Sequence, residues 1–127
     1  MTPTRCPCGL GDYAACCGRF HAGEARPATA EQLMRSRYSA FAVGDAAYLR
    51  ATWHPSTRPA DVDLDPATRW TALEILDRVR GGPFDQAGEV EFRAYHRGGV
   101  VHERSRFRRE DGAWLYVDGD HRSTDRT

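Results

Sequence analysis

The sequence predicts an α+β fold in which helices come first and an antiparallel sheet follows. Apolar residues recur at helical spacing in residues 29–44, whereas apolar and polar residues alternate from Trp70 onward. Two turn signals, Gly98-Gly99 and Asp111-Gly112, separate the alternating segments and are typical of β-hairpins. Helices followed by a meandering sheet indicate an α+β architecture, and 127 residues suit one domain with a small appendage.

The first predicted helix begins at Thr29, an N-cap residue that forms a capping box with Gln32. Its apolar positions are Leu33, Met34, Tyr38 and Phe41. Gly44 ends it, and Asp45 caps a second, shorter helix that must stop before Pro55. Residues 55–68 are rich in Pro and Asp and therefore predict a loop.

Residues 70–79 predict the first strand, and the two turn signals set the pairing of the others. With Gly98-Gly99 as a turn, the inner face of the central hairpin carries Val90, Phe92, Ala94, Glu103, Ser105 and Phe107. The outer face carries Glu89, Glu91, Arg93, Arg104, Arg106 and Arg108. The Asp111-Gly112 turn then places Tyr116 beside Phe107 and Asp118 beside Ser105.

Composition excludes several classes of function. Eighteen basic residues, all Arg, balance eighteen acidic ones, so a general nucleic-acid or membrane-surface binder is not expected. The absence of Lys excludes a P-loop or Schiff-base lysine. No apolar run is long enough for a membrane span, and the N-terminus lacks the apolar stretch of a secretory signal. We therefore expect a cytoplasmic, reducing location with no membrane association.

All four cysteines lie in one short segment, as Cys6, Cys8, Cys16 and Cys17. Four thiols match the number of ligands in a closed tetrahedral zinc site, so Zn²⁺ is the expected cofactor. Two disulfides and an iron–sulfur cluster are the alternatives, and neither suits a reducing compartment and adjacent cysteines as well. His21 is a candidate substitute ligand.

The segment CPCGLGDYAACCG resembles a SEC-C motif, the zinc knuckle found at the tail of the SecA translocase and in other proteins. The four cysteines match the four ligand positions of that motif. The resemblance implies a zinc knuckle in residues 1–24, followed by an α+β domain in residues 25–127. It departs from the motif at Leu10, where Ser is usual, and has no lysines in the turn.

A second resemblance covers nearly the whole chain. The segments LMRSRYSAFAVGDAAYLRATWHPS, HERSRF and DGAWLYVDG are similar to those of the YchJ-like family, bacterial proteins in which a SEC-C motif precedes a nuclear transport factor 2-like cone. In that cone, N-terminal helices pack on a curved antiparallel sheet. The resemblance implies this fold and zinc binding, and it implies no activity.

Glu103 is the most informative residue outside the cysteines, because the hairpin places its carboxylate on an apolar face, where it needs a partner. The residues predicted to surround a pocket with it are Arg35, Tyr38, Trp53, His54, Ser105 and Asp118. A buried Arg–Glu pair that merely closes the cone is the alternative, with Arg37 as another candidate partner.

His54 is the best candidate for acid–base chemistry, because its ordinary pKa lies near neutrality. A histidine that interacts with the last carbonyls of a helix is the simpler interpretation. The four outer arginines offer RNA a basic stripe, but interleaved Glu89 and Glu91 favour an ion-paired, solvated face.

Two hypotheses from different classes follow. The first is a zinc-binding adaptor or ligand-binding protein, whose knuckle docks on a protein or ribonucleoprotein partner and whose cone carries a site for a small ligand or a partner. The second is a small cone-fold isomerase, dehydratase or hydrolase that uses His54 with Glu103 or Asp118. The first predicts a filled cone and an exposed apolar or basic patch beside the knuckle. The second predicts an open cavity shared by His54 and a carboxylate.

Overall fold

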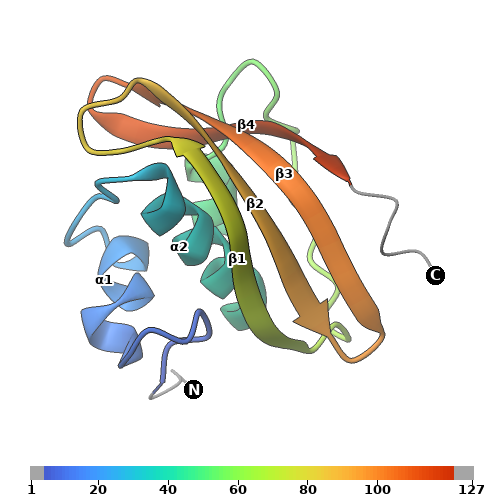
Figure 1. Cartoon of the computed structure of the whole chain (residues 1–127). Coiled ribbons are helices and arrows are strands. Elements are labelled where there is room, and N and C mark those ends of the chain that lie inside the picture. Colours follow the sequence, from blue (N-terminus) through green and yellow to red (C-terminus); the bar gives the residue numbers. More distant parts are fainter. Residues whose placement is uncertain (1–4, 122–127) are drawn as a thin grey trace.

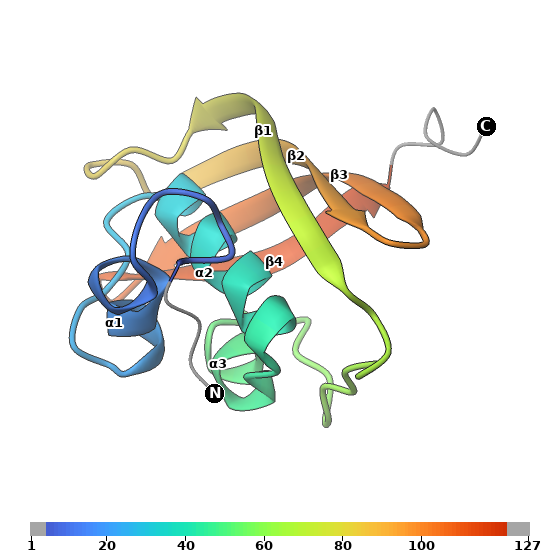
Figure 2. The same cartoon turned by 90° about the horizontal axis from the view of Figure 1, so that it is seen from below.

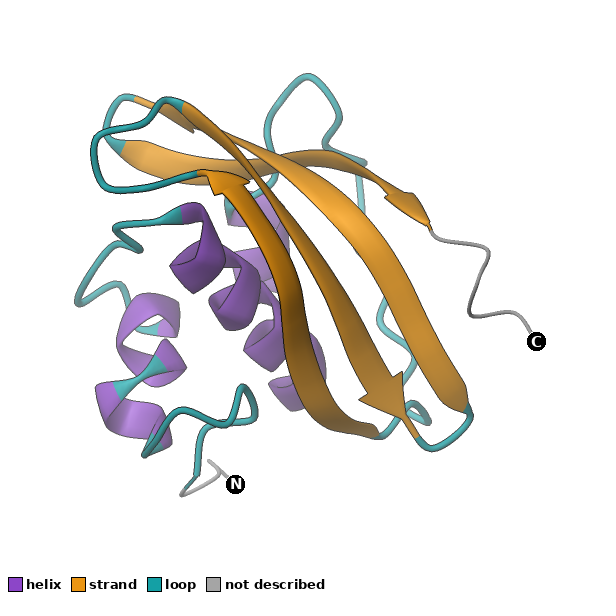
Figure 3. Cartoon of the chain, in the orientation of Figure 1, coloured by secondary structure: helices purple, strands orange, loops and turns teal. Residues whose placement is uncertain are grey.

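The helices cover one face of a curved, four-stranded antiparallel sheet in the computed structural model, which describes residues 5–121 (Figures 1 and 3). The elements in chain order are η1 (Tyr13–Ala15), α1 (Cys17–His21), α2 (Ala30–Val43), α3 (Ala46–Ala51), β1 (Trp70–Arg80), β2 (Ala87–His96), β3 (Gly99–Glu110) and β4 (Ala113–His121). The sheet is a meander in the order β1-β2-β3-β4. This arrangement confirms the predicted α+β class.

Helix α2 lies along the inner face of the sheet and carries most of the helical contribution to the core (Figure 2). The Thr29 hydroxyl caps it by accepting a hydrogen bond from the Gln32 amide at 3.1 Å. Gly44 ends it in the left-handed conformation, at φ +82°. Leu33, a residue of this helix, is fully buried. The predicted helix, its cap and its terminator are all confirmed.

The β2–β3 hairpin keeps the predicted faces but not the predicted partners. His96 pairs with Gly99, so the turn consists of Arg97 and Gly98 rather than Gly98-Gly99. Gly99 starts the strand at φ +153°, a conformation that glycine adopts without strain. The register is therefore shifted by two residues, which leaves each side chain on its expected face because strands alternate with period two.

A β-bulge in β4 overturns the predicted position of Asp118. Tyr116 pairs with Phe107 as expected, but the register then shifts and Asp118 pairs with Arg106. The extra residue, Val117, turns Asp118 to the outer face, where its carboxylate accepts from Arg106 at 2.5 Å. The Asp118 carboxylate therefore lies beside Arg106 on the outer face and not on the apolar inner face.

The core lies between α2 and the inner sheet face and extends into the cysteine segment. Its buried members are Cys6, Cys8, Cys17, Ala30, Leu33, Met34, Tyr38, Val90, Phe92, Ala94, Phe107 and Trp114. Three of the four cysteines therefore belong to the same apolar cluster as the domain. The cysteine segment therefore packs against the α+β domain and shares its core.

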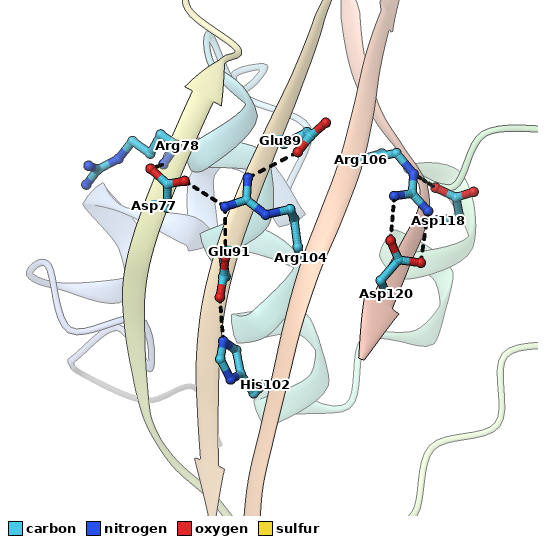
Figure 4. A network of polar contacts seen from close by, with 9 residues as sticks. All are labelled: Asp77, Arg78, Glu89, Glu91, His102, Arg104, Arg106, Asp118 and Asp120. Atoms are coloured by element: carbon cyan, nitrogen blue, oxygen red, sulfur yellow. Dashed lines mark hydrogen bonds and ion pairs between the residues drawn. The ribbon is translucent and has the colours of Figure 1, made fainter. Parts of the chain in front are cut away.

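The outer sheet face is an ion-paired lattice, drawn in Figure 4. Arg104 donates to Asp77 at 2.6 Å, to Glu91 at 2.8 Å and to Glu89 at 3.1 Å. Arg106 likewise donates to Asp118 and Asp120. Of the predicted basic stripe, Arg93, Arg104 and Arg106 thus have carboxylate partners on neighbouring strands. Arg108 pairs with Glu110 of its own strand.

Between residues 5 and 121, every helix is too short or too polar to cross a lipid bilayer.

Candidate metal centre and inner cavity

The four cysteine sulfur atoms converge on one point. The Sγ atoms of Cys6, Cys8, Cys16 and Cys17 all lie within 4.8 Å of one another. A zinc–sulfur bond of about 2.3 Å in a tetrahedron requires neighbouring sulfurs about 3.8 Å apart, and the Cys8–Cys16 separation is 3.6 Å. That distance is far from the 2.05 Å of a disulfide, and all four thiols are free. The donor set therefore fits a tetrahedral thiolate metal.

Tight turns hold the cysteine segment in shape. The Cys6 amide donates to the Gly11 carbonyl at 2.6 Å, and the Gly9 amide donates to the Cys6 carbonyl at 3.0 Å. Gly9 takes φ +91° in this turn, which a residue with a Cβ adopts only with strain. The first two thiols are thereby presented on the same side as the second pair, which sits at the start of α1.

Polar contacts from α2 fix the knuckle on the domain. The Ser39 hydroxyl lies 3.5 Å from Cys6 Sγ, and Arg35 donates to the Cys8 carbonyl at 3.2 Å. His21 bridges the two parts, since its Nε2 lies 2.8 Å from the Ser36 carbonyl and its Nδ1 lies 2.5 Å from the Tyr13 hydroxyl. Both ring nitrogens of His21 are engaged, so it is a clamp rather than a substitute ligand.

Crowding splits the pKa values of the thiols. A hydrogen bond from Cys17 is the largest influence lowering the pKa of Cys8, to about 5, while burial opposes it. Burial raises the pKa of Cys16 to about 11, and the contact with Cys8 raises the pKa of Cys17. One thiolate is thus stabilised by its neighbours' protons. Ionising all four requires a positive charge among them, which a dication supplies.

The inner cavity contains only part of the predicted pocket. A space of about 120 Å³ between α2 and the sheet is lined by Trp53, Glu103 and Ser105. Arg37, rather than Arg35, reaches it from α2, and Tyr116 reaches it from β4. The structure confirms that Glu103 lies on the inner face. Glu103 is 9% exposed, and its carboxylate accepts a hydrogen bond from Ser105 Oγ at 2.7 Å.

The other predicted pocket residues lie elsewhere. Arg35 faces Glu31 and the knuckle. Tyr38 is buried in the core, and its ring forms a T-shaped contact with that of Trp70. Burial raises the pKa of Tyr38 to about 12. Asp118 is on the outer face, as described above.

His54 also lies away from the cavity. Its Nδ1 accepts from the Ser56 amide at 3.1 Å, and its Nε2 lies 2.8 Å from a Glu110 carboxylate oxygen. This hydrogen bond is the main cause that lowers the pKa of Glu110. The structure therefore does not bring His54 together with Glu103 or Asp118.

The sequence did not predict the contacts that Ser36 and Ser39 of α2 make with the knuckle. Ser36 and Ser39 are both completely buried on α2, three residues apart. Small hydroxyl residues at that spacing on a helix otherwise rich in apolar residues are the signal that could have identified a contact surface for another element. Arg37 is a candidate partner of Glu103 in the sequence, but nothing in the sequence distinguishes it from Arg35.

Most of the chain matches a known protein family. Residues 29–119 match the family described as YchJ, middle NTF2-like domain. The chain belongs to the YchJ-like family. The match starts at the cap of α2 and ends in β4, so the cysteine segment lies before the matched NTF2-like domain.

The family relationship extends to full-length relatives. A UPF0225 protein of Streptomyces coelicolor is 63% identical over 121 residues, which cover 94% of this chain and 98% of that protein. A UPF0225 protein of Corynebacterium efficiens is 53% identical over 120 residues, 91% of this chain and 92% of that protein.

Solved structures of SEC-C motif containing proteins share the fold of this YchJ-like chain. The solution structure of one from Rhodopseudomonas palustris has a TM-score of 0.78 at 36% identity, covering 91% of this chain and 97% of its own. The crystal structure of one from Psychrobacter arcticus has a TM-score of 0.75 at 28% identity, covering 92% and 82%.

Proposed function

We propose that the protein is a cytoplasmic zinc-binding adaptor whose knuckle docks on a protein or ribonucleoprotein partner. The observation that carries this proposal is the convergence of four thiols at one point, with their inner side packed on α2 and their outer turn exposed. Similarity to SEC-C motif containing proteins supports the zinc assignment.

Cys6, Cys8, Cys16 and Cys17 would hold the zinc ion. When bound, Zn²⁺ supplies a closed structural cross-link and no vacant coordination position for chemistry. Four thiolates around one dication leave a net charge of about −2. Arg35 and Arg19, which donate to the Cys8 and Cys16 carbonyls, lie close enough to offset part of that charge.

The outer turn offers a docking surface. Leu10 at its tip is 64% exposed, and Ala14 and Ala15 are exposed beside it. Next to the knuckle, a groove of about 500 Å³ runs between α1, α3 and the start of β4, with Phe20 and Trp114 among its lining residues. An exposed apolar tip suits a partner that covers apolar surface.

Metal content is the first test. Protein purified without chelators should contain one zinc per chain by elemental analysis, and Cys16→Ser should lose it. Protein without stoichiometric zinc would refute the assignment.

Docking is tested separately by capture from a lysate of the source organism with wild type, Leu10→Glu and Leu76→Glu. Leu76 is an exposed leucine on β1 and serves as the matched control. Partners held by wild type and Leu76→Glu but lost by Leu10→Glu support docking through the outer turn. Identical partners for all three proteins would refute it.

A further inference from the structure

Three side chains form a hydrogen-bonded chain on the surface beyond the end of α3. The Ser56 hydroxyl lies 2.7 Å from Nδ1 of His54, and Nε2 of His54 lies 2.8 Å from a carboxylate oxygen of Glu110. Glu110 is the last residue of β3, so the fold joins residues 56 positions apart. A serine, a histidine and a carboxylate in this order are the arrangement by which many hydrolases activate a hydroxyl.

The backbone indicates which ring nitrogen of His54 carries the proton. The Ser56 amide can only donate, and it donates to Nδ1 at 3.1 Å, so Nδ1 of the neutral ring is an acceptor. The proton therefore lies on Nε2, which donates to the Glu110 carboxylate. The Ser56 hydroxyl then donates to Nδ1, as it must if His54 is to take its proton.

A second histidine shows that the backbone turn needs neither the hydroxyl nor the carboxylate. Nδ1 of His96 accepts from the Gly98 amide at 3.2 Å, and the two residues are separated in the same way as His54 and Ser56. The glycine carries no hydroxyl, and no carboxylate pairs with His96 among residues 5–121. The Ser56 hydroxyl and the Glu110 carboxylate are therefore additions to a turn that forms without them.

Ser56 is accessible from solution, unlike the other serines of the described chain. Ser56 is exposed. The others are buried: Ser36, Ser39 and Ser105. The His54 side chain is 16% exposed and that of Glu110 is 45% exposed. A partly shielded base thus lies beneath a hydroxyl that a reagent in water can reach.

We propose that this site hydrolyses small carboxylic esters, with Ser56 as the nucleophile, His54 as the base and Glu110 as the residue that positions His54. Ser56 Oγ forms a bond to the acyl carbon while its proton passes to Nδ1 of His54. The bond between the acyl carbon and the alkoxide oxygen breaks, and the proton on His54 goes to that oxygen, which leaves as the alcohol. Water then attacks the acyl carbon and gives a proton to His54, which returns it to Ser56 Oγ as the carboxylic acid leaves.

The openness of the site defines the class of substrate. Little of the reaction is shielded from water, so little binding energy is available to assist a poor leaving group. Esters with small acyl groups are therefore expected to react, and amides are not. Arg58 adds positive charge beside the turn, since its Nε donates to the Trp53 carbonyl at 3.0 Å. This activity goes beyond partner docking by the knuckle and does not depend on it.

The first test is covalent labelling of the zinc-loaded full chain with a fluorophosphonate, followed by mass spectrometry of its peptides. Ser56 Oγ displaces fluoride from phosphorus, so the label remains on that residue. Because a positioned base contributes about 10²–10⁴-fold, Ser56 should react at least about a hundredfold faster than N-acetylserine amide in the same solution. Labelling of Ser56 no faster than labelling of this model compound would overturn the proposal.

Histidine variants test the base. His54→Ala should slow labelling of Ser56 by at least about tenfold, whereas His96→Ala removes the histidine of the similar turn and should leave the rate unchanged. If His54→Ala fails to fold, Gly98→Ser provides a second measurement, because it adds a hydroxyl beside a histidine that has no carboxylate partner. That hydroxyl should stay unlabelled. An unchanged rate in His54→Ala, or labelling at position 98 as fast as at Ser56, would overturn the proposal.

The positioning role of Glu110 has its own readout. Glu110→Ala should slow labelling about two- to tenfold, because the His54 ring loses the hydrogen bond that orients it. Added acetate should restore part of this rate by supplying a carboxylate to an exposed position, and it should not accelerate the wild type. A purely structural role predicts no rescue by acetate, so a failure of rescue would overturn this assignment of Glu110.

Turnover is tested with p-nitrophenyl acetate. Release of nitrophenol should be accompanied by an acetyl group on Ser56 in acid-quenched samples, and Ser56→Ala should lower the rate of release at least about tenfold. An unchanged rate in Ser56→Ala would mean that a histidine ring alone hydrolyses the ester and would overturn the proposal.

Discussion

Replacing His21 with alanine should loosen the knuckle from the domain. His21 forms hydrogen bonds with the Ser36 carbonyl at 2.8 Å and with the Tyr13 hydroxyl at 2.5 Å, and its ring centre lies 4.6 Å from that of Tyr48. Each lost hydrogen bond costs about 0.5–1.5 kcal/mol. The two bonds together therefore predict a loss of about 1–3 kcal/mol in the free energy of unfolding of the zinc-loaded protein.

Urea denaturation followed by circular dichroism measures this loss. In thermal denaturation of a chain of this length, a loss of about 1 kcal/mol lowers Tm by about 4 °C. His21→Ala should therefore lower Tm by about 4–12 °C. Tyr13→Phe should cost about 1 kcal/mol by removing one of the two bonds. The double variant should cost no more than His21→Ala alone, because the same bond is lost in both. His121→Ala, at a side chain that is 74% exposed, is the control and should cost less than about 0.5 kcal/mol.

The reasoning is refuted if His21→Ala costs no more than His121→Ala. It is also refuted if the effects of His21→Ala and Tyr13→Phe simply add. The first result would mean that the knuckle behaves as an independent appendage, despite the shared core, and the second would mean that Tyr13 and His21 do not stabilise the protein through a shared hydrogen bond.

Other substitutions and conditions test separate parts of the molecule. Gly119→Ala should destabilise the protein by about 1–3 kcal/mol in urea, because its Cβ would overlap the buried carboxylate of Glu103. Thr29→Ala removes the cap of α2 and should cost about 1 kcal/mol by the same measurement. Chelation of zinc should lower Tm, and added zinc should restore it; an unchanged Tm would show that the ion does not stabilise the fold. The hydrogen bond from His54 lowers the pKa of Glu110 below its usual 4.5, so this pair stabilises the fold above that pH and the contribution is lost as pH falls through the lowered pKa. Glu110→Gln should therefore reduce the acid dependence of Tm between about pH 5 and 2.

The sequence was sufficient to predict the elements with strong local signals. The cap at Thr29 and the glycine at position 44 set the limits of α2, and both operate within one turn of helix. The inner position of Glu103 was also predictable, because the two-residue error in the hairpin register conserves the face.

Features that depend on contacts between distant segments were not predictable. The bulge at Val117 was not predictable, because residues 113–117 are all apolar and an apolar run without alternation does not set the register. The choice between Arg35 and Arg37 depends on which side of α2 faces the sheet. The cysteine segment covers the side that carries Arg35, which leaves Arg37 to enter the cavity.

The position of α2 makes it a wall common to both sites. Ser36 receives the His21 clamp on one side, and the next residue, Arg37, reaches into the cavity on the other. Consecutive residues of a helix point about 100° apart, so a rigid rotation of α2 would displace both groups at once. The position of the knuckle and the shape of the cavity therefore both depend on the same turn of one helix.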